Sequence, residues 1–145
     1  MQILGIKTRR RLLGSYGEGA AVRFLRRSGY RIIKRNFVAD PHEIDVIAED
    51  REYQVFVEVK TRTLGLESPN EPRPASSVTP EKQRAIISAA RLYTAYNPTR
   101  KKKRFDVIEV YVNKNKHKYS VAEIRHLKGT FNLNTAFSPS ERNKK

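Results

Sequence analysis

Two short stretches of the chain alternate apolar and polar residues with the two-residue period of a β-strand. They span residues 42–48 and 53–60, and both are rich in β-branched and aromatic residues. If Arg51 and Glu52 form a tight turn, the two strands pair as a hairpin in which every apolar residue of one face meets another. The expected apolar pairs are Ile44 with Val59, Val46 with Val57, and Ala48 with Val55.

The opposite face of this hairpin is predicted to bring acidic residues together. Asp45 lies opposite Glu58, and Glu43 lies opposite Lys60. Like charges that face each other across a sheet repel, so a proton, a cation or Lys60 must compensate the pair. Mg²⁺ binds such carboxylate oxygens while it keeps several waters. An ordinary solvated hairpin, with Lys60 paired to Glu43, explains the same spacing, because alternating charge is common on an exposed strand face.

The rest of the pattern predicts two helices and three more strands. The first helix is expected over residues 13–28 and the second over residues 80–96, with a start signal at Thr79-Pro80-Glu81. The further strands are expected over residues 30–37, 105–112 and 119–126. The second helix lets the fourth strand return parallel to a neighbour. The expected fold class is α/β, a mixed five-stranded sheet flanked by helices.

Composition divides the chain into three parts. Residues 1–13 form a basic N-terminal arm, residues 14–127 a single domain, and residues 128–145 a C-terminal tail. A long polar loop over residues 63–78 leaves from the Lys60 end of the third strand. Loops of this length are usually functional or disordered, and this one is placed to fold over a bound substrate.

The charge of the chain is strongly positive but unevenly distributed. The 145 residues include 30 Lys and Arg against 15 Asp and Glu, a formal net charge of +15. Residues 41–60 run against this trend, with six acidic residues and two basic ones. A basic surface attracts a polyanion, whereas an acidic segment repels phosphate unless a cation occupies it. The contrast favours an enzyme that binds nucleic acid and cleaves it at a metal ion.

Glu18, in the first predicted helix, is a further acidic candidate. The residues that follow it on the same side of the helix, Ala21, Val22 and Leu25, are apolar, so Glu18 lies at the edge of the buried face. Either it points partly toward the sheet, or it is a first-turn glutamate favoured by the helix dipole. The sequence leaves both interpretations open.

Missing and scattered residue types narrow the classes of protein further. The chain has no cysteine, which excludes disulfides, thiolate zinc sites and thiol nucleophiles and fits a reducing compartment. Its histidines, His42, His117 and His126, lack metal-ligand spacing and are assigned surface roles. No apolar run is long enough to cross a membrane. We therefore expect a cytoplasmic protein without a membrane partner.

The order of these elements and the acidic residues within them resemble the restriction-endonuclease-like superfamily. The metal motif of that superfamily has an aspartate, a variable gap, and then Asp or Glu, any residue and Lys. Here Asp45 is followed after twelve residues by Glu58-Val59-Lys60. The implied fold is a restriction-endonuclease-like core.

More closely, the chain resembles the bacterial YraN family of predicted nucleases, which is related in fold to archaeal Holliday-junction resolvases. The likeness spans about residues 14–112. It is carried by Gly17-Glu18, Gly29-Tyr30, Arg35-Asn36, residues 43–48, residues 56–62, Lys82, residues 89–93 and residues 104–107. Two departures are visible: His42 stands where the family usually has glycine, and the loop over residues 63–78 is richer in proline.

The resemblance implies a role for each acidic residue and for Lys60. Asp45 and Glu58 would bind Mg²⁺ or Mn²⁺, with the backbone carbonyl of Val59 as a further ligand. Glu18 would complete the site by binding a metal or a metal-bound water. Lys60 would orient or help deprotonate the attacking water and counter charge on the phosphate, and Glu43 would support Lys60.

Five basic residues are candidates for contact with the phosphates of a nucleic acid. Phosphate contacts come mainly from exposed Arg and Lys. The candidates therefore lie at the end of the third predicted strand, in the second predicted helix and in the basic run over residues 100–104. They are Arg62, Lys82, Lys101, Lys102 and Lys103. A plain surface role stays open for Arg62 and Lys82.

Two functions are compatible with these features. The first is a Mg²⁺-dependent endonuclease that hydrolyses phosphodiester bonds in DNA, selective for branched or damaged structure. The alternative is a non-catalytic nucleic-acid-binding module, associated with DNA or with RNA and the ribosome. A module that only binds has no need to concentrate acids, so the set of Glu18, Asp45, Glu58 and Lys60 favours the enzyme. A homodimer stays open, because no dimer interface can be identified from the sequence.

Overall fold

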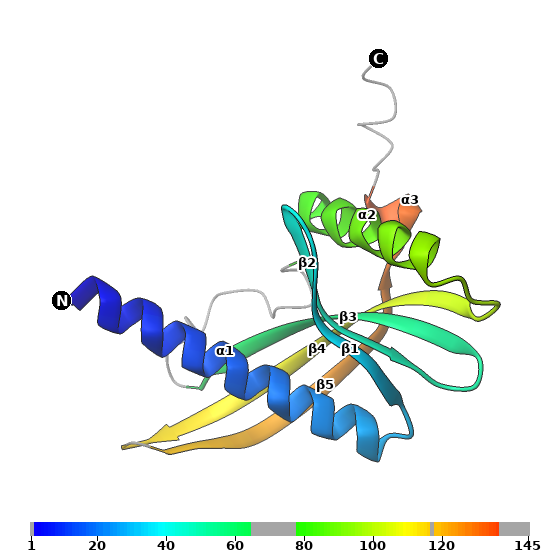
Figure 1. Cartoon of the computed structure of the whole chain (residues 1–145). Helices are drawn as coiled ribbons and strands as arrows, with labels where there is room; N and C mark the ends of the chain where they lie inside the picture. The colour runs from blue at the N-terminus through cyan, green and yellow to red at the C-terminus, as the bar shows by residue number, and fades with distance from the viewer. Residues whose placement is uncertain (1, 65–77, 117, 137–145) are drawn as a thin grey trace.

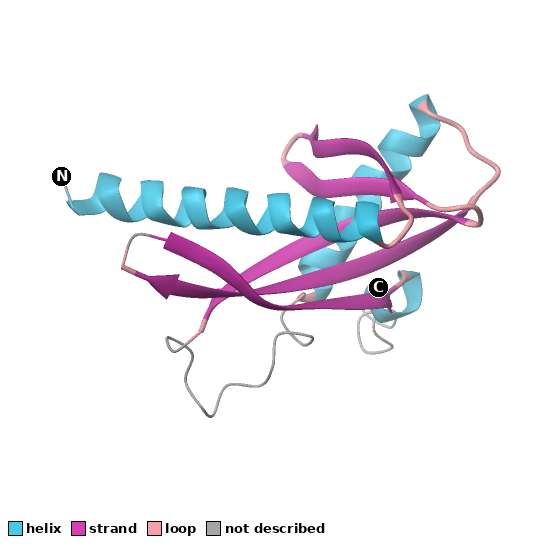
Figure 2. Cartoon of the chain, turned by 90° about the horizontal axis from the view of Figure 1, so that it is seen from below, coloured by secondary structure: helices cyan, strands magenta, loops and turns pink. Residues whose placement is uncertain are grey.

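The chain folds into a five-stranded sheet with a long helix on each face. The structure, a computed structural model, describes residues 2–64, 78–116 and 118–136, and for residues 2–10, 134 and 135 only the course of the backbone. The elements are α1 (Gln2–Arg27), β1 (Arg31–Ala39), β2 (His42–Glu49), β3 (Tyr53–Thr63), α2 (Pro80–Tyr96), β4 (Lys102–Asn115), β5 (Lys118–Phe131) and α3 (Leu133–Ala136). Figures 1 and 2 show α1 along one face of the sheet and α2 across the other. This is the mixed α/β sheet that the sequence predicts.

The five strands lie side by side in their order along the chain. Neighbours are antiparallel except for β3 and β4, which pair in parallel from Tyr53 with Lys102 to Thr63 with Val112. The chain passes through α2 between these two strands, as a parallel connection requires. The expected parallel return of the fourth strand is therefore confirmed.

The hairpin of β2 and β3 has the predicted register. Val46 pairs with Val57 and Ala48 pairs with Val55, two of the three expected apolar pairs, whereas the described pairing does not include Ile44 with Val59. The turn between the strands is closed by Asp50, whose carboxylate accepts hydrogen bonds from two backbone N–H groups that follow it. The described pairing ends at Val46 and Val57, one residue before the two acids that the register places opposite each other.

One apolar core lies under each helix. On the α1 side, Ala21 and Leu25 belong to a buried cluster with Val46 and Val57. On the α2 side, Ile86 belongs to a second buried cluster, which also contains Ile44, Ile47, Phe56, Ala90 and Val107. Because the side chains of a strand alternate between the two faces, each strand of the hairpin contributes to both cores.

The strict alternation predicted for β2 is wrong at Ile44. This residue packs on the α2 side together with Ile47, whereas Val46 packs on the α1 side. The neighbouring strand β1 is irregular at the same level, because Asn36 has a left-handed backbone with φ of 51°. The pleat is thus interrupted beside Asp45, and a short apolar pattern does not reveal such an interruption.

The predicted start signal of α2 and both of its predicted bounds are confirmed. Thr79 is the N-cap, and its side-chain oxygen accepts the N–H of Lys82 at 3.1 Å, while Pro80 begins the helix. Asn97 follows the last residue, Tyr96, and its N–H donates to the carbonyl of Tyr93. Helix ends with side-chain caps and proline are local features, so the sequence alone places them correctly.

Several elements extend further than the apolar pattern predicts. α1 begins at Gln2 rather than at residue 13, because its first turns are rich in good helix formers and contain no proline. β5 continues past the predicted end at residue 126 to Phe131, which is buried, and α3 follows. Most of the polar loop predicted over residues 63–78 lies outside the described residues. Although α1 has 26 residues, none of the described helices is long and apolar enough to span a membrane.

A buried ionic network ties β4 to β5. Arg104 donates two hydrogen bonds of 2.9 Å to the carboxylate of Asp106, and a third of 2.8 Å to the hydroxyl of Tyr30. His126 Nε2 lies 2.6 Å from Asp106 Oδ2, and the N–H of Gly129 donates to Oδ1. Burial alone would raise the pKa of Asp106, but these partners outweigh it and lower the pKa. The surface role assigned to His126 is therefore wrong, because its side chain is buried in this network.

Candidate functional site

Glu18 is positioned by the glycine that precedes it in α1. A Cβ atom at Gly17 would lie 1.8 Å from Thr61 Oγ1, so only glycine lets the helix approach β3 this closely. Glu18 follows directly and is half-buried. A groove of about 260 Å³ opens at this crossing, lined by Leu13, Gly14, Glu18, Val59, Lys60 and Thr61. The geometry favours the interpretation in which Glu18 points toward the sheet.

Asp45 lies where the described pairing of β2 with β3 has ended. Its Oδ2 atom accepts the backbone N–H of Val59 at 2.8 Å, so a side chain takes the place of a strand partner. Asp45 is half-buried, and Glu58, the residue before Val59, is 6% exposed. Val59 thus positions the carboxylate of Asp45 through its backbone N–H group. The binding of a metal by the carbonyl of Val59 stays a prediction.

Two lysines approach Glu58 from different elements. Lys60 Nζ lies 3.4 Å from Glu58 Oε1, and Lys82 Nζ, from the first turn of α2, lies 3.9 Å from the same oxygen. Lys60 therefore pairs with Glu58, and the support of Lys60 by Glu43 stays a prediction. The structure adds Lys82 to the acidic site itself, whereas the sequence predicts only a phosphate contact for this residue.

Asn36 joins two of the acidic residues and was not identified from the sequence. With its amide nitrogen toward them, Asn36 donates to Glu18 Oε2 at 3.0 Å and to Glu43 Oε1 at 3.1 Å. Its left-handed backbone is one that asparagine tolerates better than most residues. Asparagine is also uncommon in strands, and this is a sequence signal that could have singled it out. Asn36 links α1 to β2 and holds two carboxylates that would otherwise repel.

Nearby positive charge only poorly compensates the carboxylates at the Asp45 end of the β2–β3 hairpin. Burial, and after it the charge of Glu58, raises the pKa of Asp45 from 3.8 to about 7, with smaller contributions from Glu18 and Glu43 and an opposing one from the Val59 N–H. Burial and the charge of Glu43 raise the pKa of Glu18 as well, although Arg35 opposes this. Such shifts mark a place where negative charge is held against its own repulsion.

The acids at the other end of the hairpin are, in contrast, neutralised. Lys101 Nζ lies 3.4 Å from Glu49 and donates to the carbonyl of Asp50 at 2.7 Å, while Lys102 pairs with Glu52 at 3.3 Å. Because Lys102 pairs with the first residue of β3, this end lies roughly 16 Å along the strand from Glu58. The acidic segment of the sequence is therefore two separate groups, and the group around Asp45 is the one in which burial and neighbouring acids raise the pKa of a carboxylate.

The structure does not bring all predicted site residues together. It gathers Glu18, Glu43, Asp45, Val59, Glu58, Lys60 and Lys82 around the end of the β2–β3 pairing. Arg62 lies two residues beyond Lys60 on β3 and is half-buried. Lys101 and Lys102 bind residues of the distant β2–β3 turn, and Lys103 donates to the hydroxyl of Thr94 on α2.

The donor atoms at this site fit a hard divalent cation. Asp45 and Glu58 supply carboxylate oxygens, the ligands that Mg²⁺ prefers, and one or two carboxylates suffice when water fills the other positions. Burial and the charge of Glu58 raise the pKa of Asp45, so a cation beside this carboxylate would favour its charged form. Among the described residues, no three acidic or histidine side chains lie close enough together to enclose an ion. The fit is therefore to a cation held by two carboxylates and water.

Replacing Asp45 with asparagine is expected to stabilise the metal-free protein more at pH 8 than at pH 5. The pKa of Asp45 is raised on folding, so the folded state resists losing this proton and the stability falls as the pH rises from about 4 to about 7. Asparagine keeps an oxygen for the Val59 N–H and removes the charge, a gain on the order of 2 kcal/mol above pH 7. Urea unfolding of both proteins in chelator at the two pH values measures the difference. A loss of stability at pH 8 would mean that the charged carboxylate is itself structural.

Comparison with known proteins places the described site inside a recognised family region. The model of the uncharacterised protein family UPF0102 matches residues 17–110. A UPF0102 protein of Chlorobium phaeobacteroides (strain BS1) is 44% identical over 117 residues, which cover 80% of this chain and 86% of the relative. UPF0102 proteins of Caldanaerobacter subterraneus subsp. tengcongensis and of Acetivibrio thermocellus are 37% and 40% identical, over 86% and 88% of this chain and 98% and 97% of the relatives. The matched region includes every residue gathered at the site.

Proposed function

The chain belongs to the uncharacterised protein family UPF0102, and we propose that it is a metal-dependent nuclease that hydrolyses phosphodiester bonds in DNA. One observation carries the proposal. Asp45 and Glu58 come from adjacent strands to a place where their charges are not balanced, with Lys60 beside them and Glu18 next to them on α1. A binding module has no use for such a concentration of acids, whereas metal-assisted hydrolysis requires it.

Each residue of the site has a role that its position supports. Mg²⁺ or Mn²⁺ held by Asp45 and Glu58 would supply positive charge to the scissile phosphate and make a water easier to deprotonate. The side chain of Lys60 is 28% exposed, so its ammonium group can reach both this water and the phosphate, whose growing negative charge it would counter. Glu18 would accept a hydrogen bond from the water. Lys82 would hold the phosphate from the α2 side.

The arrangement of elements supports a restriction-endonuclease-like core. The acidic residues sit on the second and third strands of a mixed sheet, Glu18 sits on the preceding helix, and the third strand pairs in parallel with the fourth. In this proposal the preferred substrates are branched or damaged DNA. The formation of a homodimer and the location in the cytoplasm stay predictions. Because fold likeness alone does not establish an activity, the proposal depends on the site.

The most suitable surface for the DNA backbone lies at the end of the molecule where α1 begins. The first half of α1 and the tip of the β4–β5 hairpin both project there (Figures 1 and 2). Tyr16 of α1 packs on Tyr119 of β5, with ring centroids 5.5 Å apart. Neither residues 2–17 nor residues 113–120 contain an acid, and the hairpin carries the exposed Lys114, Lys116 and Lys118.

Replacing the three hairpin lysines with glutamine is expected to weaken DNA binding and its dependence on salt. The slope of log Kd against log salt should fall by about 2–3, because up to three phosphate contacts are lost. The matched control replaces Lys101, Lys102 and Lys103 with glutamine, which removes the same charge from residues that already have partners. Fluorescence anisotropy with a duplex over a range of salt concentrations measures both variants. An equal loss in the control would show that net charge, rather than this surface, binds DNA.

A cleavage assay tests the proposed function. The intact chain is incubated with Mg²⁺ or Mn²⁺ and with duplex, single-stranded and four-way-junction DNA, beside Asp45→Asn and Glu58→Gln. We expect metal-dependent cutting of at least one DNA by the intact chain and none by either variant, with DNA binding retained in all three. Equal binding without cutting in all three would contradict the nuclease and would support the non-catalytic binding module.

A further inference from the structure

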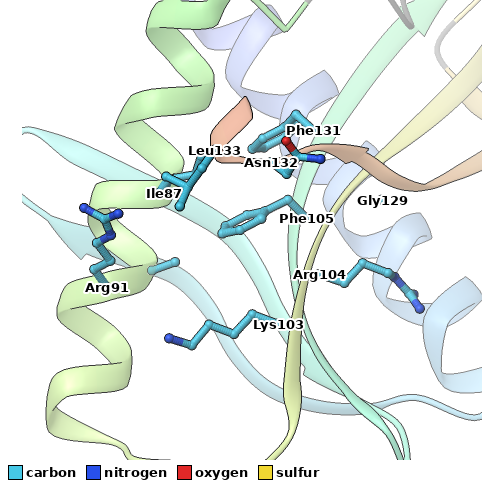
Figure 3. Close-up of a pocket in the computed structure, with 10 residues that line it drawn as sticks. Ile87, Arg91, Lys103, Arg104, Phe105, Gly129, Phe131, Asn132 and Leu133 are labelled. Atoms are coloured by element: carbon cyan, nitrogen blue, oxygen red, sulfur yellow. The ribbon is translucent and has the colours of Figure 1, made fainter. Parts of the chain in front are cut away.

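A second cavity lies away from the acidic site, between α2, the start of β4, the end of β5 and α3. It measures about 680 Å³, within the range of known ligand pockets. Figure 3 shows Ile87 and Arg91 of α2 on one side and Phe105 of β4 pointing toward them. Lys82 and Glu43 line a different groove, between α2 and the turn before β2. A ligand bound in the 680 Å³ cavity beside Phe105 would therefore leave the acidic site accessible.

The floor of the cavity is apolar, and its aromatic rings are already stacked on one another. Ile87, Ala90, Phe105, Phe131 and Leu133 line it. Phe105 stacks between Phe56 and Phe131, with ring centroids 5.5 Å and 5.3 Å apart and interplanar angles of 28° and 25°. Phe105 thus offers the cavity its edge rather than a free face. Leu133, at the opening, is 47% exposed.

The rim of the cavity is cationic. Arg91 is exposed, and its guanidinium group has no hydrogen-bond or ion-pair partner within the described part of the chain. Lys103 reaches toward α2 in the same direction as Phe105 and donates to the uncharged hydroxyl of Thr94, whereas the guanidinium of Arg104 turns away toward Asp106 (Figure 3). No acidic residue is among the ten that line the cavity. The occupant should therefore combine an apolar group with negative charge.

A nucleobase fits this description poorly. Bases bind proteins by stacking on free aromatic faces or by hydrogen bonds to their edges, and here the faces of Phe105 are covered. The polar edges of a base would lie against Ile87, Phe131 and Leu133 without partners, which is unfavourable. A hydrocarbon side chain has no such requirement.

We propose that this cavity binds a short acidic peptide segment of a partner protein. One large apolar side chain of the segment fills the space above Phe105 and Ile87, and neighbouring carboxylates pair with Arg91 and Lys103. Charge complementarity selects this occupant: the cavity has two cations at its rim, an apolar floor and no acid. An apolar anchor surrounded by polar rim contacts is the usual arrangement at small protein interfaces.

Binding of a defined peptide to the full chain tests the proposal. The probe is a fluorescein-labelled Asp-Asp-Glu-Leu-Phe peptide with a free C-terminal carboxylate, measured by fluorescence anisotropy. We expect saturable binding with a Kd of about 10–100 µM, and a loss of at least about tenfold in Leu133→Asp and in Arg91→Glu. A peptide with Ser-Ser in place of Leu-Phe should not bind.

Matched controls decide whether the cavity is responsible. Leu92→Asp changes a leucine of similar exposure on the outer side of α2, and Arg23→Glu reverses an exposed arginine on α1. Both should bind the peptide like the unmodified chain, and circular dichroism should show all four variants folded. The proposal is overturned if no saturable binding occurs or if the controls lose as much as the cavity variants. It is also overturned if binding appears only after residues 137–145 are removed, because the chain's own tail is then the occupant.

Discussion

Replacing Lys60 with methionine is expected to slow metal-dependent DNA cleavage by about 10²–10⁴-fold, as the loss of a catalytic proton-transfer group does. Methionine keeps the length and apolar stem of the side chain but removes the ammonium group, which lies 3.4 Å from Glu58 Oε1. The group is expected to act on the attacking water and on the phosphate, so the affinity for DNA should change little. Single-turnover cleavage of a labelled four-way junction measures the rate, and anisotropy measures the affinity.

Lys82→Met is the matched control for this experiment. Lys82 approaches the same oxygen of Glu58 at 3.9 Å but from α2, and its side chain is 44% exposed. A residue that only contacts phosphate should weaken DNA binding when it is removed, with a small effect on the rate of the bound complex. If Lys60→Met cuts as fast as the intact chain, or if both variants lose the same rate, Lys60 has no special part in the chemistry.

Replacing Asp106 with alanine is expected to lower the free energy of unfolding by about 3–5 kcal/mol, because Arg104 would be left charged and largely buried without its partner. For a chain of this size the loss corresponds to a fall in Tm on the order of 10 °C. The pKa of Asp106 is lowered in the folded state, so its contribution is present above pH 3.8 and disappears as the pH falls further. Urea unfolding at neutral pH, monitored by circular dichroism, measures the change.

An exposed ion pair provides the comparison for Asp106. Glu52 pairs with Lys102 at 3.3 Å, and both side chains are more than half exposed. Pairs of this kind contribute little, so Glu52→Ala should leave the unfolding curve nearly unchanged. Equal effects of Asp106→Ala and Glu52→Ala would show that burial of the network around Arg104 does not matter for stability.

Features specified by neighbouring residues could be predicted from the sequence. Thr79 and Pro80 fix the start of α2 through a hydrogen bond and a backbone angle that belong to those residues themselves. The register of β2 with β3 follows from matching apolar partners, and this register in turn brings Asp45 and Glu58 to adjacent strands at the same level. The central pair of the candidate site was therefore accessible from the pattern alone.

Features that depend on distant contacts could not be predicted in this way. Asn36 bridges Glu18 and Glu43 only because α1 packs on β3 at Gly17 and the pleat of β1 is interrupted. His126 is buried because β4 and β5 bring it to Asp106, and nothing near His126 in the sequence signals that. The partners of such residues are set by tertiary packing, which a local pattern does not contain.

The same reason separates the two acidic groups of the hairpin. Charge counted along the sequence adds Glu49, Asp50 and Glu52 to the acids of the site. In three dimensions β4 starts beside that turn, so Lys101 and Lys102 neutralise it. Only the parallel pairing of β3 with β4 creates this contact. The acidic site is consequently smaller than the charge count along the sequence implies.

Calorimetric titration of the metal-free chain with Mn²⁺ measures most directly whether Asp45 and Glu58 form a cation site. We expect saturable binding by the intact chain, loss of that binding in both Asp45→Asn and Glu58→Gln, and unchanged binding in Glu52→Gln at the neutralised turn. Absence of saturable binding by the intact chain, or binding that survives in both site variants, would show that these carboxylates do not hold a metal ion.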